Sequence, residues 1–253
     1  MRFSQFDDPN LEAAIREAIR KSEGVITEGD LRSIIELKAP DNNISDITGI
    51  EKCVNLKMLM LYENQINDVA PLSSLTRLTD LWLRVNQVRD LSALSNLTNL
   101  TFLNLGQNQI SDITPLSNLT NLTLLNLAYN QIADPSPLAN LTNLKRLYLR
   151  DNTISDVAFL SNLSNLTCLW LDGNQITDLA PLAKLINLEK LYLGGSNWGN
   201  SISDITPLME NKGLSEGDEV NLEGNPLNDE AYDVHIPALK KRGIKVSFDP
   251  KQH

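Results

Sequence analysis

The sequence predicts an α/β solenoid, a fold in which short coils of chain stack along one axis. The first observation is a fixed period of 22 residues, because seven consecutive frames open with a leucine at that spacing. The second observation is the content of each frame, L-x-x-L-x-L-x-x-N-x-(I/V)-x-D, usually followed by P-L-x-x-L. A period of about 20 to 29 residues on this pattern is typical of leucine-rich repeats. The opening leucines are Leu56, Leu78, Leu100, Leu122, Leu144, Leu166 and Leu188.

Residues 1–33 are expected to form a helical cap before the repeats. Asp8 stands directly before a proline, which is typical of an N-cap followed by the first residue of a helix. We expect this helix to end near Gly24. Thr27 and Asp30 resemble a capping box that opens a second short helix. The apolar stripe of the first helix is Leu11, Ile15, Ala18 and Ile19.

The repeats are expected over residues 34–229 as about nine coils, with an insertion near residues 194–200. Each coil covers its apolar edges only with its neighbours, so we expect one continuous array. The first coil is degenerate, because Ala39 and Cys53 stand where leucines usually occur. Within a coil, L-x-L predicts a strand with both leucines pointing inward.

Two polar rows run through the repeats. An asparagine at frame position 9 is expected to bond the exposed backbone where the chain leaves the strand. These are Asn64, Asn86, Asn108, Asn130, Asn152 and Asn174. An aspartate four positions later is expected to cap the short helical turn that follows, and a ladder of bound cations is the alternative interpretation. These are Asp46, Asp68, Asp90, Asp112, Asp134, Asp156, Asp178 and Asp204.

Residues 230–253 are expected to close the array as a helix-strand cap. Glu230 to Arg242 is expected to be a helix bent by Pro237, and Gly243 is expected to end it. Alternating apolar residues then predict a final strand, with Ile244, Val246 and Phe248 on one side. Because both ends are capped, we expect a monomer.

Charge and composition exclude several classes of function. The formal net charge is −10, which opposes binding to nucleic acid and to anionic membranes. Cys53 and Cys168 lie about five to six coils apart, roughly 24–29 Å, too far for a disulfide. No apolar stretch is long enough to span a membrane. The N-terminus has no apolar signal segment, so either the protein is cytoplasmic or a leader has been removed.

The frame N-x-(I/V)-x-D-(I/V/L)-x-P-L-x-x-L-(T/S)-N resembles the internalin family of bacterial leucine-rich repeat proteins, as does the helical cap before the repeats. The resemblance implies a leucine-rich repeat horseshoe with a parallel concave β-sheet and short 3-10 or helical turns on its convex side. It also implies a cell-surface or secreted protein that binds proteins across the concave sheet. The tail NPLNDEAYDVHIPALKKRGIKVSF instead resembles the end cap of related bacterial repeat proteins, and no cell-wall sorting pattern follows it.

The residues between the inward leucines are expected to point out of the sheet and to form the binding surface. Tyr148, Trp170 and Tyr192 occupy one frame position in three successive coils. Aromatic residues beside arginine are enriched at binding hot spots, so we centre the site on Trp170. An alternative is that aromatic residues merely suit strands. The charged neighbours are Arg146, Arg150, Asp172 and Lys190, and a second cluster is Tyr62, Trp82, Arg84 and Phe102.

Three further features are expected to lie around this surface. Gly173, Gly194 and Gly195 are expected to keep the neighbouring rim low. Trp198, on the insertion, is a candidate contact or a residue folded onto the last coils. Cys168 lies on the predicted concave face, where nearby Lys190 and Arg146 would favour its thiolate.

No pattern for catalysis, a metal site or a cofactor is visible. The two histidines are His235 in the C-terminal cap and His253 at the end of the chain, and no phosphate loop or nucleophile elbow occurs. We therefore expect a non-catalytic module that binds a protein partner without a cofactor or metal. The alternatives are an intracellular scaffold or recognition arm of a larger signalling protein, and a glycan-binding surface protein.

Overall fold

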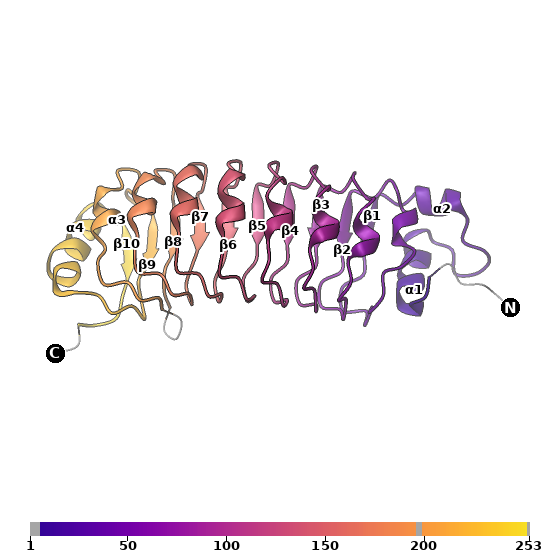
Figure 1. Cartoon of the computed structure of the whole chain (residues 1–253), viewed down its shortest axis with the longest axis horizontal. Coiled ribbons are helices and arrows are strands. Elements are labelled where there is room, and N and C mark those ends of the chain that lie inside the picture. Colours follow the sequence, from indigo (N-terminus) through magenta and orange to yellow (C-terminus); the bar gives the residue numbers. More distant parts are fainter. Residues whose placement is uncertain (1–5, 196–198, 252–253) are drawn as a thin grey trace. The chain divides into compact units, whose positions relative to one another are not determined.

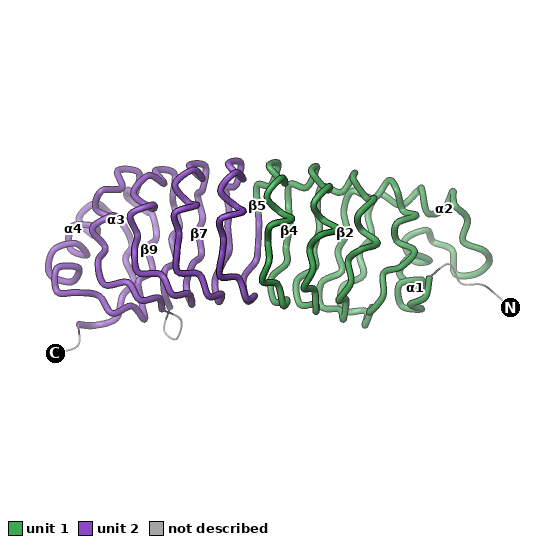
Figure 2. Tube along the Cα trace, in the orientation of Figure 1, with its two compact units in different colours: residues 1–124 green, residues 125–253 purple. Residues whose placement is uncertain are grey.

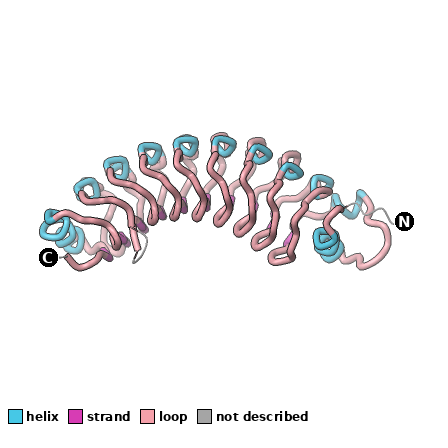
Figure 3. The backbone as a smooth tube through the Cα atoms, turned by 60° about the horizontal axis from the view of Figure 1, so that its bottom comes forward, coloured by secondary structure: helices cyan, strands magenta, loops and turns pink. Residues whose placement is uncertain are grey.

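The computed structural model describes residues 6–195 and 199–251. The chain divides into two compact units, residues 1–124 and residues 125–253 (Figure 2). In each unit, coils carry parallel strands on one side and short helices on the other (Figure 1 and Figure 3). The strand order follows the chain order in both units. The predicted α/β solenoid is confirmed.

Unit 1 opens with helix α1 (Pro9–Ala18), and the predicted N-cap is confirmed. The carboxylate of Asp8 accepts the N–H groups of Asn10 and Leu11 at 2.8 and 3.3 Å. The predicted end near Gly24 is wrong. The helix ends at Ala18, because Arg20 takes a left-handed conformation with φ 54° that a right-handed helix cannot continue.

The second cap helix, α2 (Glu28–Arg32), also begins as predicted. The Thr27 hydroxyl accepts the Asp30 N–H, and the Asp30 carboxylate accepts the Thr27 N–H. The stripe on α1 is only partly as predicted. Leu11 and Ile15 are buried, but Ala18 is exposed at the end of the helix.

The repeats of unit 1 pair each strand residue with the residue 22 positions later. Leu59, Leu81 and Leu103 in these strands are fully buried, as the L-x-L pattern predicts. The strands are β1 (Glu36–Lys38), β2 (Met58–Met60), β3 (Asp80–Trp82) and β4 (Phe102–Asn104). The 3-10 helices opposite them span Ile50–Lys52, Ala70–Leu72, Ser92–Leu94 and Thr114–Leu116.

Unit 2 continues the same plan, and strand β5 (Leu124–Asn126) contains the boundary between the units. The remaining strands are β6 (Arg146–Tyr148), β7 (Cys168–Trp170), β8 (Lys190–Tyr192), β9 (Glu219–Asn221) and β10 (Lys245–Ser247). The 3-10 helices span Ser136–Asn140, Ala158–Asn162 and Ala180–Lys184, and α3 (Thr206–Glu210) replaces the next one.

The C-terminal cap differs in detail from its prediction. The expected single helix is a π-helical segment (Ala231–His235) followed directly by α4 (Ile236–Lys241). Pro237 lies in the first turn of α4, where its missing N–H costs little. Gly243 ends the helix with φ 82°, and β10 follows, as predicted.

Buried asparagines tie each coil to the one before it. The Asn86 amide donates to the carbonyl of Leu83 in its own coil at 3.1 Å and to that of Leu61 at 2.9 Å. Its oxygen accepts the Ile66 N–H at 2.9 Å. The predicted ladder is therefore confirmed. The same three bonds recur at Asn64, Asn108, Asn152, Asn174, Asn200 and Asn225, and Asn130 donates within its own coil.

The residue before the ladder asparagine has a left-handed backbone in most coils. Val85 has φ 56° and Tyr129 has φ 57°, although side chains disfavour this region. Gly173 takes the same place with φ 69°. The turn is therefore imposed by the bonds between coils and not by local preference.

The aspartate row starts the short helices as predicted, except at Asp46, whose helix begins two residues beyond its bonded N–H. The carboxylate of Asp68 accepts the Ala70 N–H at 2.8 Å, at the first residue of a 3-10 helix. The other members accept the N–H two residues later at 2.7 to 2.9 Å. Over residues 6–195 and 199–251, no three metal-ligating side chains gather.

Cys53 is buried and Cys168 is half-buried, and both are free thiols. Among the described residues, none of the helices combines the length and apolar character needed to cross a membrane.

We expect Asn86→Ala to lower the free energy of unfolding by about 1–3 kcal/mol, because the substitution leaves the Ile66 N–H buried without a partner and removes one of the two amide donors from each of the Leu61 and Leu83 carbonyls. Urea denaturation followed by circular dichroism measures this loss. The matched control is Asn96→Ala, at an exposed asparagine of the same coil, which should cost less than about 0.5 kcal/mol. Equal losses for the two variants would show that the ladder does not hold the coils together.

Candidate functional site

Three aromatic side chains lie next to one another in unit 2. Tyr148, Trp170 and Tyr192 are in register across β6, β7 and β8. They lie on the strand face, which we define as the side of the sheet opposite the buried leucines, and all three are half-buried. Their ring centroids are 5.2 Å apart for Tyr148 and Trp170, and 5.1 Å apart for Trp170 and Tyr192. We call these residues the ring row.

The rings of the row meet at steep angles. The planes of Tyr148 and Trp170 form an angle of 75°, and those of Trp170 and Tyr192 form an angle of 56°. Such edge contacts are favourable between aromatic rings. The indole Nε1 of Trp170 is buried and has no hydrogen-bond partner within the described part of the chain. The row is thus a packed unit.

Arg150 lies beside the ring row. Its Nε is 3.0 Å from Oδ2 of Asp172, and its guanidinium carbon is 5.2 Å from the ring centroid of Tyr129 and 5.9 Å from that of Trp170. A cation above an aromatic face at these distances is stabilised by the ring. Three groups from the two neighbouring coils therefore fix this guanidinium.

Asp172 does not lie where the sequence predicted. It was expected at the surface, but only 4% of it is exposed, because it packs behind Arg150. Burial raises the pKa of its carboxyl to about 6, although Arg150 acts in the opposite direction. Burial also raises the pKa of Asp151 in the preceding coil. Asp172 can therefore act on a partner only through Arg150.

The other two predicted cations, Arg146 and Lys190, are exposed on the opposite side of the ring row. Lys190 Nζ is 3.9 Å from Oε2 of Glu219, and the Tyr192 hydroxyl donates to the same oxygen at 3.0 Å. A cavity of about 180 Å³ beside Tyr192 is lined in part by Glu219 and Lys245. The end of the row is therefore polar.

Sequence reasoning missed Tyr129, Glu219 and Lys245 as members of this surface. Tyr129 lies at the turn after a strand, a position not expected to face Arg150. Glu219 pairs with Lys190 across 29 residues and not 22, because the insertion shifts the frame. The pattern Ile244, Val246, Phe248 indicated a strand there, and aligning it with β9 would have found Lys245.

The second predicted cluster lies on the strand face of unit 1 and is only partly assembled. Trp82 and Phe102 stack with centroids 4.1 Å apart and an angle of 23° between their planes. Tyr62 is half-buried. Arg84 pairs with Glu63, because its Nη1 is 3.6 Å from the Glu63 carboxylate.

The expectation that neighbouring cations favour the Cys168 thiolate is wrong. Burial raises the pKa of this thiol, which outweighs the opposite effect of Lys190 and Arg146. A half-buried thiol with a raised pKa is a poor nucleophile at neutral pH.

Two of the three glycines of the rim, Gly173 and Gly194, allow close packing. A Cβ atom on Gly194 would lie 1.8 Å from the Glu223 carbonyl oxygen, so a larger residue does not fit. At Gly173 a Cβ atom would lie 2.9 Å from Oδ1 of Asp151. Gly195 is the one of the three with open space around it.

Two residues singled out in the sequence, Trp198 and His253, lie outside the described residues. His235 is buried in the C-terminal cap, with Nε2 3.8 Å from the Glu230 carboxylate.

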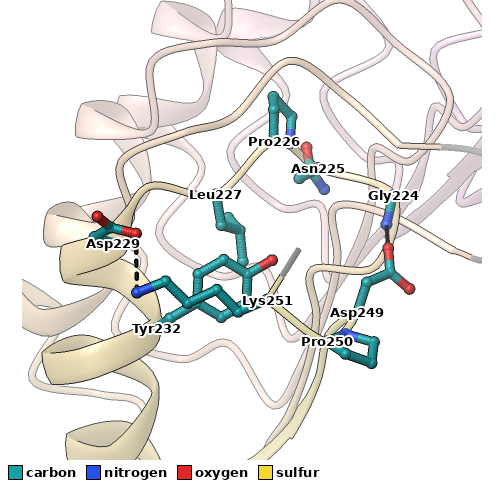
Figure 4. Close-up of a pocket in the computed structure, with 9 residues that line it drawn as sticks. All are labelled: Gly224, Asn225, Pro226, Leu227, Asp229, Tyr232, Asp249, Pro250 and Lys251. Carbon is teal, nitrogen blue, oxygen red and sulfur yellow. Dashed lines mark hydrogen bonds and ion pairs between the residues drawn. The ribbon is translucent and has the colours of Figure 1, made fainter. Parts of the chain in front are cut away.

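The C-terminal cap of unit 2 contains a cavity of about 460 Å³ (Figure 4). Its charged groups already have partners. Lys251 Nζ is 2.9 Å from carboxylate oxygens of both Asp229 and Asp233, and the Asp249 carboxylate accepts the Gly224 N–H. These pairs join the chain end to the cap, which is a structural role.

We expect Asp172→Asn to change how stability depends on pH. Because the carboxyl has a pKa of about 6 when folded and an ordinary value near 4 when unfolded, the folded state binds the proton more tightly. The unfolding free energy of the wild type should therefore rise as pH falls from 7.5 to 4.5, by about 1–2 kcal/mol relative to the Asn variant. Urea denaturation at several pH values measures this difference, and a constant difference would contradict the assignment.

Comparison with known proteins agrees with the fold and the repeats. A family model described as Leucine Rich repeats (2 copies) matches residues 76–118, 120–162 and 164–208, more than half of the chain. The structure of internalin C2 from Listeria monocytogenes is 41% identical, with a TM-score of 0.78, and the match covers 82% of this chain and 91% of that chain. The search of curated proteins gave no match.

Two further solved structures share the fold at lower identity. The functional domain of InlJ from Listeria monocytogenes is 27% identical, with a TM-score of 0.65 and coverage of 89% of this chain and 52% of that chain. A leucine-rich repeat protein of Leptospira interrogans is 26% identical, with a TM-score of 0.70 and coverage of 83% and 52%. With these repeats, this cap and this identity to internalin C2, the chain belongs to the internalin-like family of bacterial leucine-rich repeat proteins.

Proposed function

We propose that this protein binds a protein partner across the strand face of unit 2, centred on Trp170. The internalin-like fold is that of a protein-interaction module. The observation that carries the proposal is the ring row, three half-buried aromatic side chains in register on a face where the core needs none. Aromatic residues beside arginine dominate the energy of many protein interfaces.

The geometry of the rings favours a protein over a glycan. A sugar stacks on an open ring face, but the steep angles of the row direct ring edges and faces at one another. In unit 1, Trp82 and Phe102 stack nearly parallel, so each ring covers one face of the other. Quenching of tryptophan fluorescence by oligosaccharides would favour the glycan instead.

Charged residues on both sides of the ring row extend the proposed contact. Arg146 and Lys190 are exposed on one side, and Arg150, held by Asp172, lies on the other. We assign the unit 1 residues Tyr62, Trp82, Arg84 and Phe102 to a second, separate contact. The proposed role is binding without catalysis, which is typical of the family.

We expect Trp170→Ala to weaken binding of an identified partner by at least about 2 kcal/mol, roughly 30-fold, with little change in stability. Proteins retained by the wild type and lost from a Trp170/Tyr148/Tyr192 triple alanine variant would be identified by mass spectrometry. Each would then be purified and titrated by calorimetry.

The matched control is Ile186→Ala, which removes an apolar side chain that is 57% exposed and lies outside the strands of unit 2. This variant should bind as the wild type does. If Trp170→Ala keeps full affinity for a partner that the wild type binds, the site has been placed wrongly.

A further inference from the structure

We propose that Arg150 is a preset receptor for a carboxylate on an acidic segment of the protein partner. The inference rests on the proposed function, because it names the chemistry of the partner at the same face. It starts from how completely the rest of the molecule fixes this one guanidinium.

Arg150 is held from behind and from the sides. Asp172 lies behind it at 3.0 Å, and that carboxylate is itself almost fully buried. Tyr129 and Trp170 flank the guanidinium at 5.2 and 5.9 Å. A side chain already held in one position loses little conformational freedom when it binds a ligand.

The outer end of the guanidinium is unused. The contact with Asp172 is an ion pair made by Nε, whose N–H does not point along a hydrogen bond. The Nη groups make no hydrogen bond to the described residues, and 24% of the side chain is exposed. A guanidinium edge of this kind pairs with both oxygens of one carboxylate.

The charges around Arg150 make the binding of an anion depend on pH. Two carboxylates act on it, Asp151 from its own coil and Asp172 from the next, and each has one buried oxygen without a partner in the described structure. No other charged side chain is recorded against Asp172. Protonation of Asp172 would therefore leave Arg150 less neutralised, so carboxylate binding should strengthen as pH falls from 7.5 to 5.5.

A carboxylate is favoured over a sulfated sugar by what surrounds the arginine. Arg146 and Lys190 place two more exposed cations across the ring row, and the row itself offers ring edges to the apolar groups of a peptide. An acidic peptide segment carries both kinds of group, whereas a sulfated sugar needs open ring faces.

The test is a nuclear magnetic resonance titration of the whole ¹⁵N-labelled chain with acetyl-aspartyl-amide. We expect the Arg150 Nε–H and Trp170 Nε1–H signals to shift and saturate, while the Trp82 signal of unit 1 stays in place. Acetyl-asparaginyl-amide has the same shape without the charge and should produce no shift. Equal shifts from the two compounds would overturn the proposal, and so would an N-acetylglucosamine 6-sulfate that saturates the same signals at lower concentration.

Variants separate Arg150 from charge in general. Arg150→Lys keeps the positive charge but loses the planar guanidinium that can donate two parallel hydrogen bonds. The Trp170 signal should therefore give an affinity for acetyl-aspartyl-amide that is lower by about threefold or more. Arg89→Lys changes an exposed arginine of unit 1 held by Gln109 at 2.8 Å and should have no effect. Asp172→Asn should tighten binding at pH 7.5 by about twofold and remove most of the pH dependence.

The two proposals fail separately. The titration needs no partner, so the absence of an aspartate-specific shift would overturn only the proposal that Arg150 binds a carboxylate. A Trp170→Ala variant that keeps full affinity for the partner would overturn the proposal that the partner binds the strand face of unit 2, whatever the result of the titration. Loss of affinity in Arg89→Lys equal to that in Arg150→Lys would also overturn the assignment of Arg150.

Discussion

The hydrogen bonds of the asparagine ladder are the constraint on which the rest of each unit depends. A chain that turns off a strand every 22 residues leaves backbone carbonyls and N–H groups buried, and unpaired groups of this kind are costly. Asn86 satisfies three of them across two coils. Because its bonds have fixed lengths, they also set the register at which the leucines of successive coils meet.

This register places the outward residues of successive coils side by side, so that within each unit they form a surface. With the leucines committed inward, each strand presents its intervening residue on the same line as its neighbours. Three rings at 22-residue spacing thus become contacts about 5 Å apart. The partner-facing chemistry is carried by positions that the core leaves unconstrained, which is why they differ so much from coil to coil.

The sequence predicted well whatever depends on position within the frame. The strands, the asparagine bonds, the aspartates before the 3-10 helices and the Thr27 capping box all follow from local pattern. Patterns of this kind report which side of the chain a residue occupies. They are reliable here because the same frame recurs and each coil supports the assignment of the next.

The errors have a common physical origin in contacts between side chains of different coils. Asp172 occupies an outward position, yet Arg150 of the preceding coil folds over it and takes it out of water. Cys168 is likewise covered enough for desolvation to outweigh its cationic neighbours. The early end of α1 depends on one backbone angle at Arg20, which the sequence pattern does not indicate. Tyr129 also joins the site from a turn.

The left-handed turn at Tyr129 has a consequence for how such a surface can change over evolutionary time. A glycine at that position would relax the backbone, as Gly173 does at the equivalent place. It would also delete the ring beside Arg150. Position 129 therefore cannot satisfy both demands. A glycine there relaxes the turn but removes the aromatic contact, and a tyrosine keeps the contact on a strained backbone.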